Sequence, residues 1–217
     1  MIDFLHAKGL MIRVFLSCLL LLPLVAAQAA EGQLEIGSIS GRPAQTKQLP
    51  PTQEAPPGGD FTLQSASGPV SLKDFRGKVV LLFFGYASCP DICPTALSNI
   101  ANMLNALSEE ELTKVRGLFI SVDPKRDTPE KLADYVAYFH SGLVGVTGGE
   151  EEVARVAGLY GAQYYEVELE GSAMGYAVNH SSVTYLVTPA GDLRFIFPHG
   201  TPPSMFLEAV RHVLAGR

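Results

Sequence analysis

The chain has 217 residues, of which 47% are hydrophobic and 18% charged, and its formal net charge is −6 at pH 7. This length suits one domain together with a targeting segment. The charge balance is acidic and no basic cluster is present, so nucleic-acid-binding proteins are excluded as a class and we expect no nucleic acid partner.

Residues 1–30 have the pattern of an export signal. Lys8 and Arg13 supply positive charge, residues 14–25 are almost wholly apolar, and small residues follow at Ala27-Gln28-Ala29, as at a cleavage site. We expect this segment to be a signal peptide that is removed on export. The alternative is an uncleaved N-terminal membrane anchor, although the apolar core is short for a membrane span.

Residues 31–57 are polar and rich in proline, without any hydrophobic period, which predicts a linker. The domain then occupies residues 58–217, where predicted strands and helices alternate. The strands are predicted at residues 60–64, 79–84, 117–122, 143–147, 163–169, 182–187 and 193–197. The helices are predicted at residues 94–107, 109–111, 129–139, 150–160 and 206–214. This order predicts an α/β three-layer sandwich in which a mixed central sheet is flanked by helices.

Two cysteines lie on the turn where the buried strand 79–84 becomes a helix. Three residues separate Cys89 from Cys93, and Pro94 suits the first helical position. The nearby helix N-terminus favours thiolate, which is both the nucleophile of disulfide exchange and a soft metal ligand. A redox pair, a metal-binding pair and a plain structural disulfide are therefore open alternatives from the spacing alone.

Four motifs in order resemble the Sco/SenC family, the copper-binding assembly factors of cytochrome c oxidase. The motifs are Cys89-Pro90-Asp91-Ile92-Cys93-Pro94, Phe119-Ile120-Ser121-Val122-Asp123-Pro124-Lys125-Arg126-Asp127-Thr128, Leu143-Val144-Gly145-Val146-Thr147-Gly148 and Val178-Asn179-His180-Ser181. The resemblance covers residues 58–214 and implies a thioredoxin-like fold. Such a fold would place His180 opposite the two cysteines, at a position where disulfide-exchanging relatives carry a cis-proline.

The resemblance implies copper as the bound metal, with Cys89, Cys93 and His180 as its ligands. Two thiolates suit Cu(I), and an imidazole suits either oxidation state. The same two cysteines would form a Cys89–Cys93 disulfide when oxidised. Asn179 stands where the family usually has Asp, and we expect it to lie just outside the ligands. Asp123 belongs to a polar turn after a buried strand. We expect its side chain also to lie just outside the ligands. The alternative is that Asp123 only helps to form the turn.

Two functions follow from this resemblance. The first is a copper metallochaperone that delivers one copper ion to the dinuclear copper site of cytochrome c oxidase. The second is a thiol–disulfide oxidoreductase that reduces the copper-ligand cysteines of the oxidase subunit, in which Cys89 attacks and Cys93 resolves. A peroxidase is a third option, which the CxxxC pair and His180 argue against.

We expect the protein to be exported and to act in the bacterial periplasm or at the periplasmic face of the inner membrane. An exported pair of cysteines tends to oxidise, so a metal-binding role requires a reductant. The expected partners are the copper-binding subunit of the oxidase and other periplasmic copper chaperones or thiol reductants. A membrane would be contacted only through a possible N-terminal anchor.

Overall fold

The computed structural model describes residues 56–217. The predicted signal segment 1–30 and all but the last two residues of the predicted linker lie outside the described residues. Within residues 56–217, no helix combines the length and the apolar character that crossing a membrane requires.

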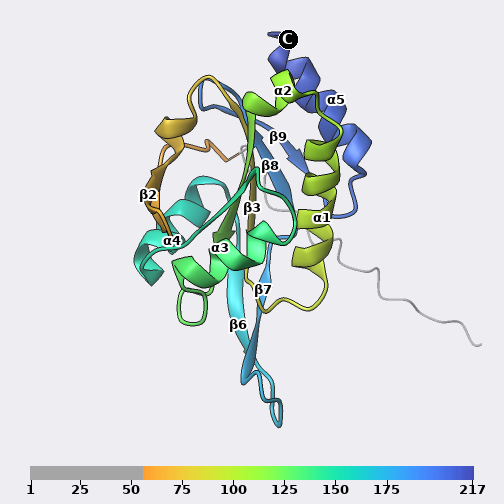
Figure 1. Ribbon diagram of the computed structural model, residues 1–217. Helices are drawn as coiled ribbons and strands as arrows, with labels where there is room; N and C mark the ends of the chain where they lie inside the picture. The colour runs from red at the N-terminus through yellow and green to blue at the C-terminus, as the bar shows by residue number, and fades with distance from the viewer. Residues whose placement is uncertain (1–55) are drawn as a thin grey trace, which may run out of the picture. The chain divides into compact units, whose positions relative to one another are not determined.

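A five-stranded mixed sheet forms the centre of the domain, in the strand order β5-β4-β3-β8-β9 (Figure 1). The three strands β3, β4 and β5 run parallel, whereas β8 is antiparallel to β3 and β9 is antiparallel to β8. The prediction of a mixed sheet is confirmed. The strands are β3 Val79–Gly85, β4 Val115–Ser121, β5 Leu143–Val146, β8 Thr184–Val187 and β9 Leu193–Phe197.

Helices cover both faces of this sheet. On one face, Phe119 of β4 contacts Tyr135, which belongs to α3, and Gly85 lies against Cys93 of α1. The helix α5 packs beside α1 on that face (Figure 1). On the other face, Phe84 contacts Tyr160 at the end of α4. The helices are α1 Ile92–Asn105, α2 Glu109–Thr113, α3 Pro129–Ala137, α4 Glu150–Leu159 and α5 Pro203–Leu214.

The central strand β3 is fully buried along its whole length, as expected for a parallel strand covered on both faces. Its register pairs Phe83 with Phe119, so the two rings face the same helical layer. At the β5 edge, the small hairpin of β1 (Thr62–Ser65) and β2 (Gly68–Ser71) adds a bridge from Gln64 to Thr147. A 3-10 helix, Leu72–Phe75, then leads toward β3.

The start of α1 differs from the prediction. The helix begins at Ile92, so Pro94 occupies its third position instead of its first. Proline is still tolerated there, because the first four amide groups of a helix have no partner within the helix. The predicted start of α3 is confirmed, with Thr128 accepting from the Lys131 amide and Pro129 following as the first helical residue.

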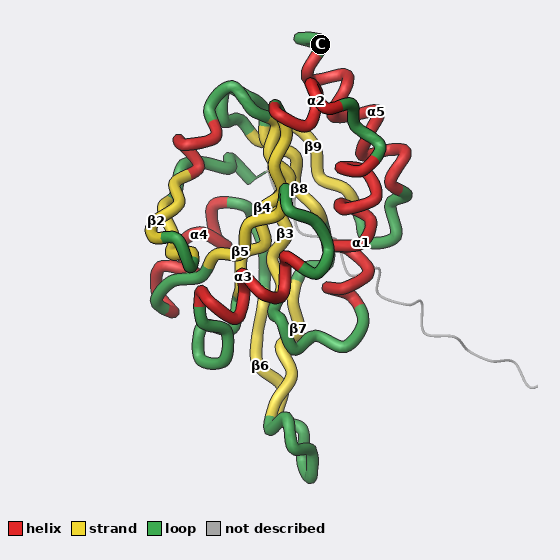
Figure 2. The backbone as a smooth tube through the Cα atoms, in the orientation of Figure 1, coloured by secondary structure: helices red, strands yellow, loops and turns green. Residues whose placement is uncertain are grey.

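The chain segment that carries His180 forms a separate two-stranded sheet. Its strands are β6, Tyr164–Glu168, and β7, Tyr176–His180, which pair antiparallel. Figures 1 and 2 show this hairpin extending away from the end of the central sheet. The sequence predicted β6 but not β7. In β7 only Val178 is buried, so the strand lacks the clear alternation that identifies a strand from sequence.

Candidate metal centre

The two cysteines lie where β3 passes into α1. Cys93 is completely buried in the first turn of α1, and Cys89 is half-buried in the preceding loop. Gly85 at the end of β3 makes this position possible. A Cβ atom on that residue would lie 2.5 Å from the Cys93 Sγ and 2.9 Å from the Phe119 ring. The buried thiol therefore rests directly on the backbone of the central strand.

His180, the last residue of β7, completes the group. Its Nε2 atom lies 3.4 Å from the Cys93 Sγ. Its Nδ1 atom lies 3.2 Å from the carbonyl oxygen of Ser181, which suits a protonated Nδ1 that donates to this oxygen and leaves the Nε2 lone pair directed at the sulfur. The two sulfur atoms and a nitrogen of His180 all lie within 4.8 Å of one another.

Two aromatic rings orient the imidazole. The rings of Phe83 and Tyr86 meet it edge to face, at centroid distances of 5.8 and 5.9 Å. Phe83 belongs to β3, and Tyr86 begins the loop that leads to Cys89. The imidazole is thus held between the strand and the cysteine loop. Neither ring was singled out from the sequence, because a buried aromatic residue in a strand or just after it normally indicates only a core.

The two thiols have very different acidities. The hydrogen bond from Cys93 lowers the pKa of Cys89 to about 3, although burial opposes the shift. The hydrogen bond to Cys89 and burial raise the pKa of Cys93. Near neutral pH the pair therefore shares one proton, with the thiolate on the more accessible sulfur. This state can either attack a disulfide or accept a soft metal ion.

The donor set fits a soft metal ion. Two cysteine sulfurs and one imidazole nitrogen are the ligands that Cu(I), Cu(II) and Zn(II) accept. A metal ion would displace the shared proton and the short contact between Cys93 and His180. Both cysteines are free thiols in the structure, so each sulfur is available as a ligand.

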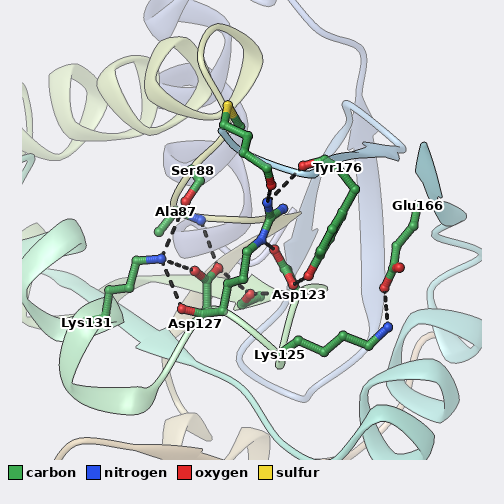
Figure 3. A network of polar contacts seen from close by, with 11 residues as sticks. Ala87, Ser88, Asp123, Lys125, Asp127, Lys131, Glu166 and Tyr176 are labelled. Carbon is green, nitrogen blue, oxygen red and sulfur yellow. Dashed lines mark hydrogen bonds and ion pairs between the residues drawn. The ribbon is translucent and has the colours of Figure 1, made fainter. Parts of the chain in front are cut away.

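A polar network contacts the segments that carry the candidate ligands, and Figure 3 shows this network. Asp123 is buried, and its carboxylate accepts hydrogen bonds from Arg126 Nε at 2.5 Å and from the Tyr176 hydroxyl at 2.7 Å. Asp127 is also buried and accepts from the backbone N–H of Ala87 at 2.8 Å. The predicted polar turn therefore does more than end a strand, since it contacts the segments that carry the candidate ligands. Tyr176, which no motif indicated, is part of this network.

Asn179 faces away from the imidazole. It is exposed, and its Nδ2 donates to the Tyr165 hydroxyl at 2.9 Å. The register pairs Tyr165 with Asn179 and Tyr164 with His180. Because successive side chains on a strand point to opposite faces, Asn179 and His180 diverge. The structure thus places the Asn179 amide on the outer face of the hairpin instead of beside the imidazole, where the sequence led us to expect it.

A family model described as SCO1/SenC matches residues 50–215. The chain belongs to the SCO1/SenC family. The mitochondrial SCO2 homolog of Bos taurus is 36% identical over 200 residues, which are 91% of this chain and 75% of that protein. A SCO2-like protein of Rickettsia conorii is 34% identical over 156 residues, which are 71% of this chain and 76% of that protein.

Solved structures of Sco proteins share the fold. The crystal structure of Arabidopsis thaliana ScoI with copper bound is 35% identical, with a TM-score of 0.68, over 74% of this chain and 99% of that chain. The structure of Bradyrhizobium japonicum ScoI with copper bound is 34% identical, with a TM-score of 0.65, over 72% of this chain and 99% of that chain. The predicted thioredoxin-like fold is confirmed.

Proposed function

We propose that this protein is a copper metallochaperone that binds one copper ion through Cys89, Cys93 and His180 and delivers it to the dinuclear copper site of cytochrome c oxidase. The observation that carries the proposal is the convergence of these three donor groups within 4.8 Å. Two similar Sco proteins are described with copper bound, which supports copper as the ion.

The accessibility of the three groups suits transfer. Cys93 is fully buried and Cys89 is half-buried, so a partner can approach the metal from the Cys89 side. Thiolates of the copper-binding subunit of the oxidase would replace Cys89 first and the buried sulfur last. Stepwise exchange of soft ligands keeps the copper ion coordinated throughout. The direction of transfer is set by the relative copper affinities of this protein and the oxidase subunit.

A second candidate function is reduction of the copper-ligand cysteines of the oxidase, and the unequal thiol acidities favour it. The Cys89 thiolate would attack a partner disulfide and release one partner thiolate. Cys93 would then lose its proton and attack the Cys89 sulfur of the mixed disulfide. The partner gains two electrons, one proton from Cys93 and a second proton from water, and this protein is left with a Cys89–Cys93 disulfide. A periplasmic thiol reductant would be needed to restore the thiols.

Metal analysis of the purified protein tests the site. We expect reduced protein to hold one copper per chain and oxidised protein to hold little, since a disulfide offers no thiolate. His180→Ala should weaken copper binding, whereas His199→Ala, at an exposed histidine beyond β9, is the matched control and should not. Equal loading of reduced and oxidised protein would contradict the three-ligand site.

Complementation separates the two functions. His180→Ala removes a copper ligand but leaves both thiols. A cell that carries only this variant should fail to load oxidase copper if the protein is a chaperone. Normal oxidase copper in that cell, together with loss of copper in Cys89→Ser, would favour the reductase.

We also propose that residues 1–30 direct export, as a signal peptide or an anchor, that residues 31–57 form a linker, and that residues 58–217 act in the bacterial periplasm or at the periplasmic face of the inner membrane. Export is compatible with the bacterial relatives among the matches. N-terminal sequencing of the mature protein and cell fractionation test this proposal. An intact N-terminus in a cytoplasmic fraction would contradict it.

A further inference from the structure

The position of His180 depends on a hairpin that is not part of the central sheet. Within the described residues, β6 and β7 pair only with each other. The His180 end of β7 is held by the short connection to β8 and by the hydrogen bond from the Ser181 amide to the Gln163 carbonyl at 2.8 Å. The buried side chain of Val178 holds the middle of β7. The far end of the strand, about 13 Å from His180 at the usual rise of a strand, has a contact of its own.

Arg126 supplies that contact. Its Nη1 donates to the carbonyl oxygen of Tyr176 at 2.8 Å and to that of Met174 at 3.1 Å, at the start of β7. Its guanidinium carbon lies 3.7 Å from the centre of the Tyr176 ring. The Tyr176 hydroxyl donates to Asp123, which also accepts from Arg126 Nε. The side chains of Asp123, Arg126 and Tyr176 thus each contact the other two, and Tyr176 is the first residue of β7.

The neighbouring residue holds the other half of the centre. The Asp127 side chain is completely buried and accepts from the Ala87 amide, two residues before Cys89, at 2.8 Å. Its other oxygen pairs with Lys131 Nζ at 2.8 Å, and Lys131 also lies 3.4 Å from the Ser88 hydroxyl (Figure 3). Two adjacent residues therefore fix the cysteine loop and the hairpin relative to each other.

A further contact connects Arg126 to the imidazole indirectly, through the Tyr86 ring. The guanidinium carbon lies 5.6 Å from the centre of the Tyr86 ring, and the edge-to-face contact of that ring with His180 has a centroid distance of 5.9 Å. The arginine therefore supports one of the two rings that orient the ligand. Displacing it would loosen both the strand that carries His180 and the ring beside it.

We propose that Arg126 is a positioning residue that holds the His180 imidazole against the two cysteine sulfurs. This inference rests on the proposed copper site. Arg126 acts through β7 and Tyr86 and does not bind the metal. Without it both thiolates remain, but the imidazole is no longer held where it completes the site.

The test compares Arg126→Gln with Lys125→Gln. Both change a cationic side chain that contacts the hairpin. Lys125, however, makes only an exposed ion pair with Glu166, at 2.6 Å, and exposed pairs contribute little. Competition titrations with Cu(II) should show a loss of affinity of about 10–100-fold for Arg126→Gln, the range typical of outer-sphere changes. Lys125→Gln should change the affinity by no more than about twofold.

Electron paramagnetic resonance of the Cu(II) form distinguishes positioning from a general loss of stability. The nitrogen hyperfine structure of the imidazole should weaken or disappear in Arg126→Gln and persist in Lys125→Gln. In a His180→Ala background, Arg126→Gln should cause no further loss of affinity, because its effect passes through that imidazole. Should Arg126→Gln not fold, Tyr176→Phe removes the bond to Asp123 and should give a smaller change in the same sense.

Three results would overturn the inference. The first is unchanged copper affinity and an intact nitrogen signal in Arg126→Gln while His180→Ala loses copper affinity. This result would refute the positioning role of Arg126 but not the three-ligand copper site. An equal loss caused by Arg126→Gln with and without His180 would show that the arginine acts on the thiols or on the fold. Unchanged copper affinity in His180→Ala would refute the three-ligand site and this inference together.

Discussion

Asp127 offers the sharpest test of how the cysteine loop is held. One carboxylate oxygen, Oδ2, accepts from the Ala87 amide at 2.8 Å and from the Ser121 hydroxyl at 2.7 Å. The other oxygen pairs with Lys131. We compare Asp127→Ala, which removes all three contacts, with Asp127→Asn, which keeps one oxygen for the two buried donors.

The contacts give the expected magnitudes. Asp127→Ala leaves two donors without an acceptor in a buried position, and each costs about 1–3 kcal/mol. The free energy of unfolding should therefore fall by about 2–6 kcal/mol. Asp127→Asn loses mainly the ion pair, whose lysine side chain is 42% exposed and can turn to water. Its cost should be about 1 kcal/mol.

Denaturant unfolding of the reduced, metal-free protein measures both values. Circular dichroism is the suitable signal, since the chain has no tryptophan. In thermal unfolding, each kcal/mol corresponds to about 2–4 °C in Tm for a domain of this size. Asp134→Ala, at an exposed position on α3, is the control and should stay within about 0.5 kcal/mol of the wild type.

Two results would refute this reasoning. Equal losses in Asp127→Ala and Asp127→Asn would mean that the ion pair, and not the two hydrogen bonds, stabilises the loop. A loss in Asp127→Ala no larger than that in Asp134→Ala would mean that the loop does not need the carboxylate at all.

Four further predictions concern the candidate metal centre directly. Gly85→Ala brings a Cβ to 2.5 Å from the Cys93 Sγ, so it should cost about 1–3 kcal/mol of stability and weaken copper binding; unchanged copper affinity would mean that the thiol can move freely. The pKa of Cys89 is lowered to about 3 from the ordinary value of 9.0, so alkylation followed by peptide mapping should label Cys89 at pH 5 and leave Cys93 unmodified. Because that pKa is lowered on folding, the stability that Cys89 contributes is complete above pH 9.0 and is lost as the pH falls toward 3. The difference in the free energy of unfolding between the reduced wild type and Cys89→Ser should therefore grow as the pH rises from about 3 to 9.0. A difference that does not change with pH would contradict the lowered pKa. Asn179→Asp should leave the affinities for Cu(I) and Cu(II) nearly unchanged, because residue 179 faces away from the imidazole; tighter Cu(II) binding in paired titrations would show that the hairpin turns on metal binding.

Local signals in the sequence determined much of the fold. The apolar run of β3 is buried on both faces, and the caps at Ser108 and Thr128 begin helices where predicted. Such features depend on neighbouring residues and on hydrophobic spacing, which a sequence displays directly. The placement of Cys89 and Cys93 after that strand likewise needed only the order of the elements.

Only the tertiary structure decided how the centre is assembled. Cys93 and His180 are 87 positions apart, and their contact depends on a hairpin whose second strand has too little burial to be predicted. The direction of Asn179 follows from the register of that hairpin, and a shift of one residue would exchange its face with that of His180. The role of Arg126 depends on backbone carbonyl groups of β7, which every sequence offers and no motif marks. Contacts between distant segments are set by packing and register, and this is why the candidate ligands could be named from the sequence while the residues that hold them in place could not.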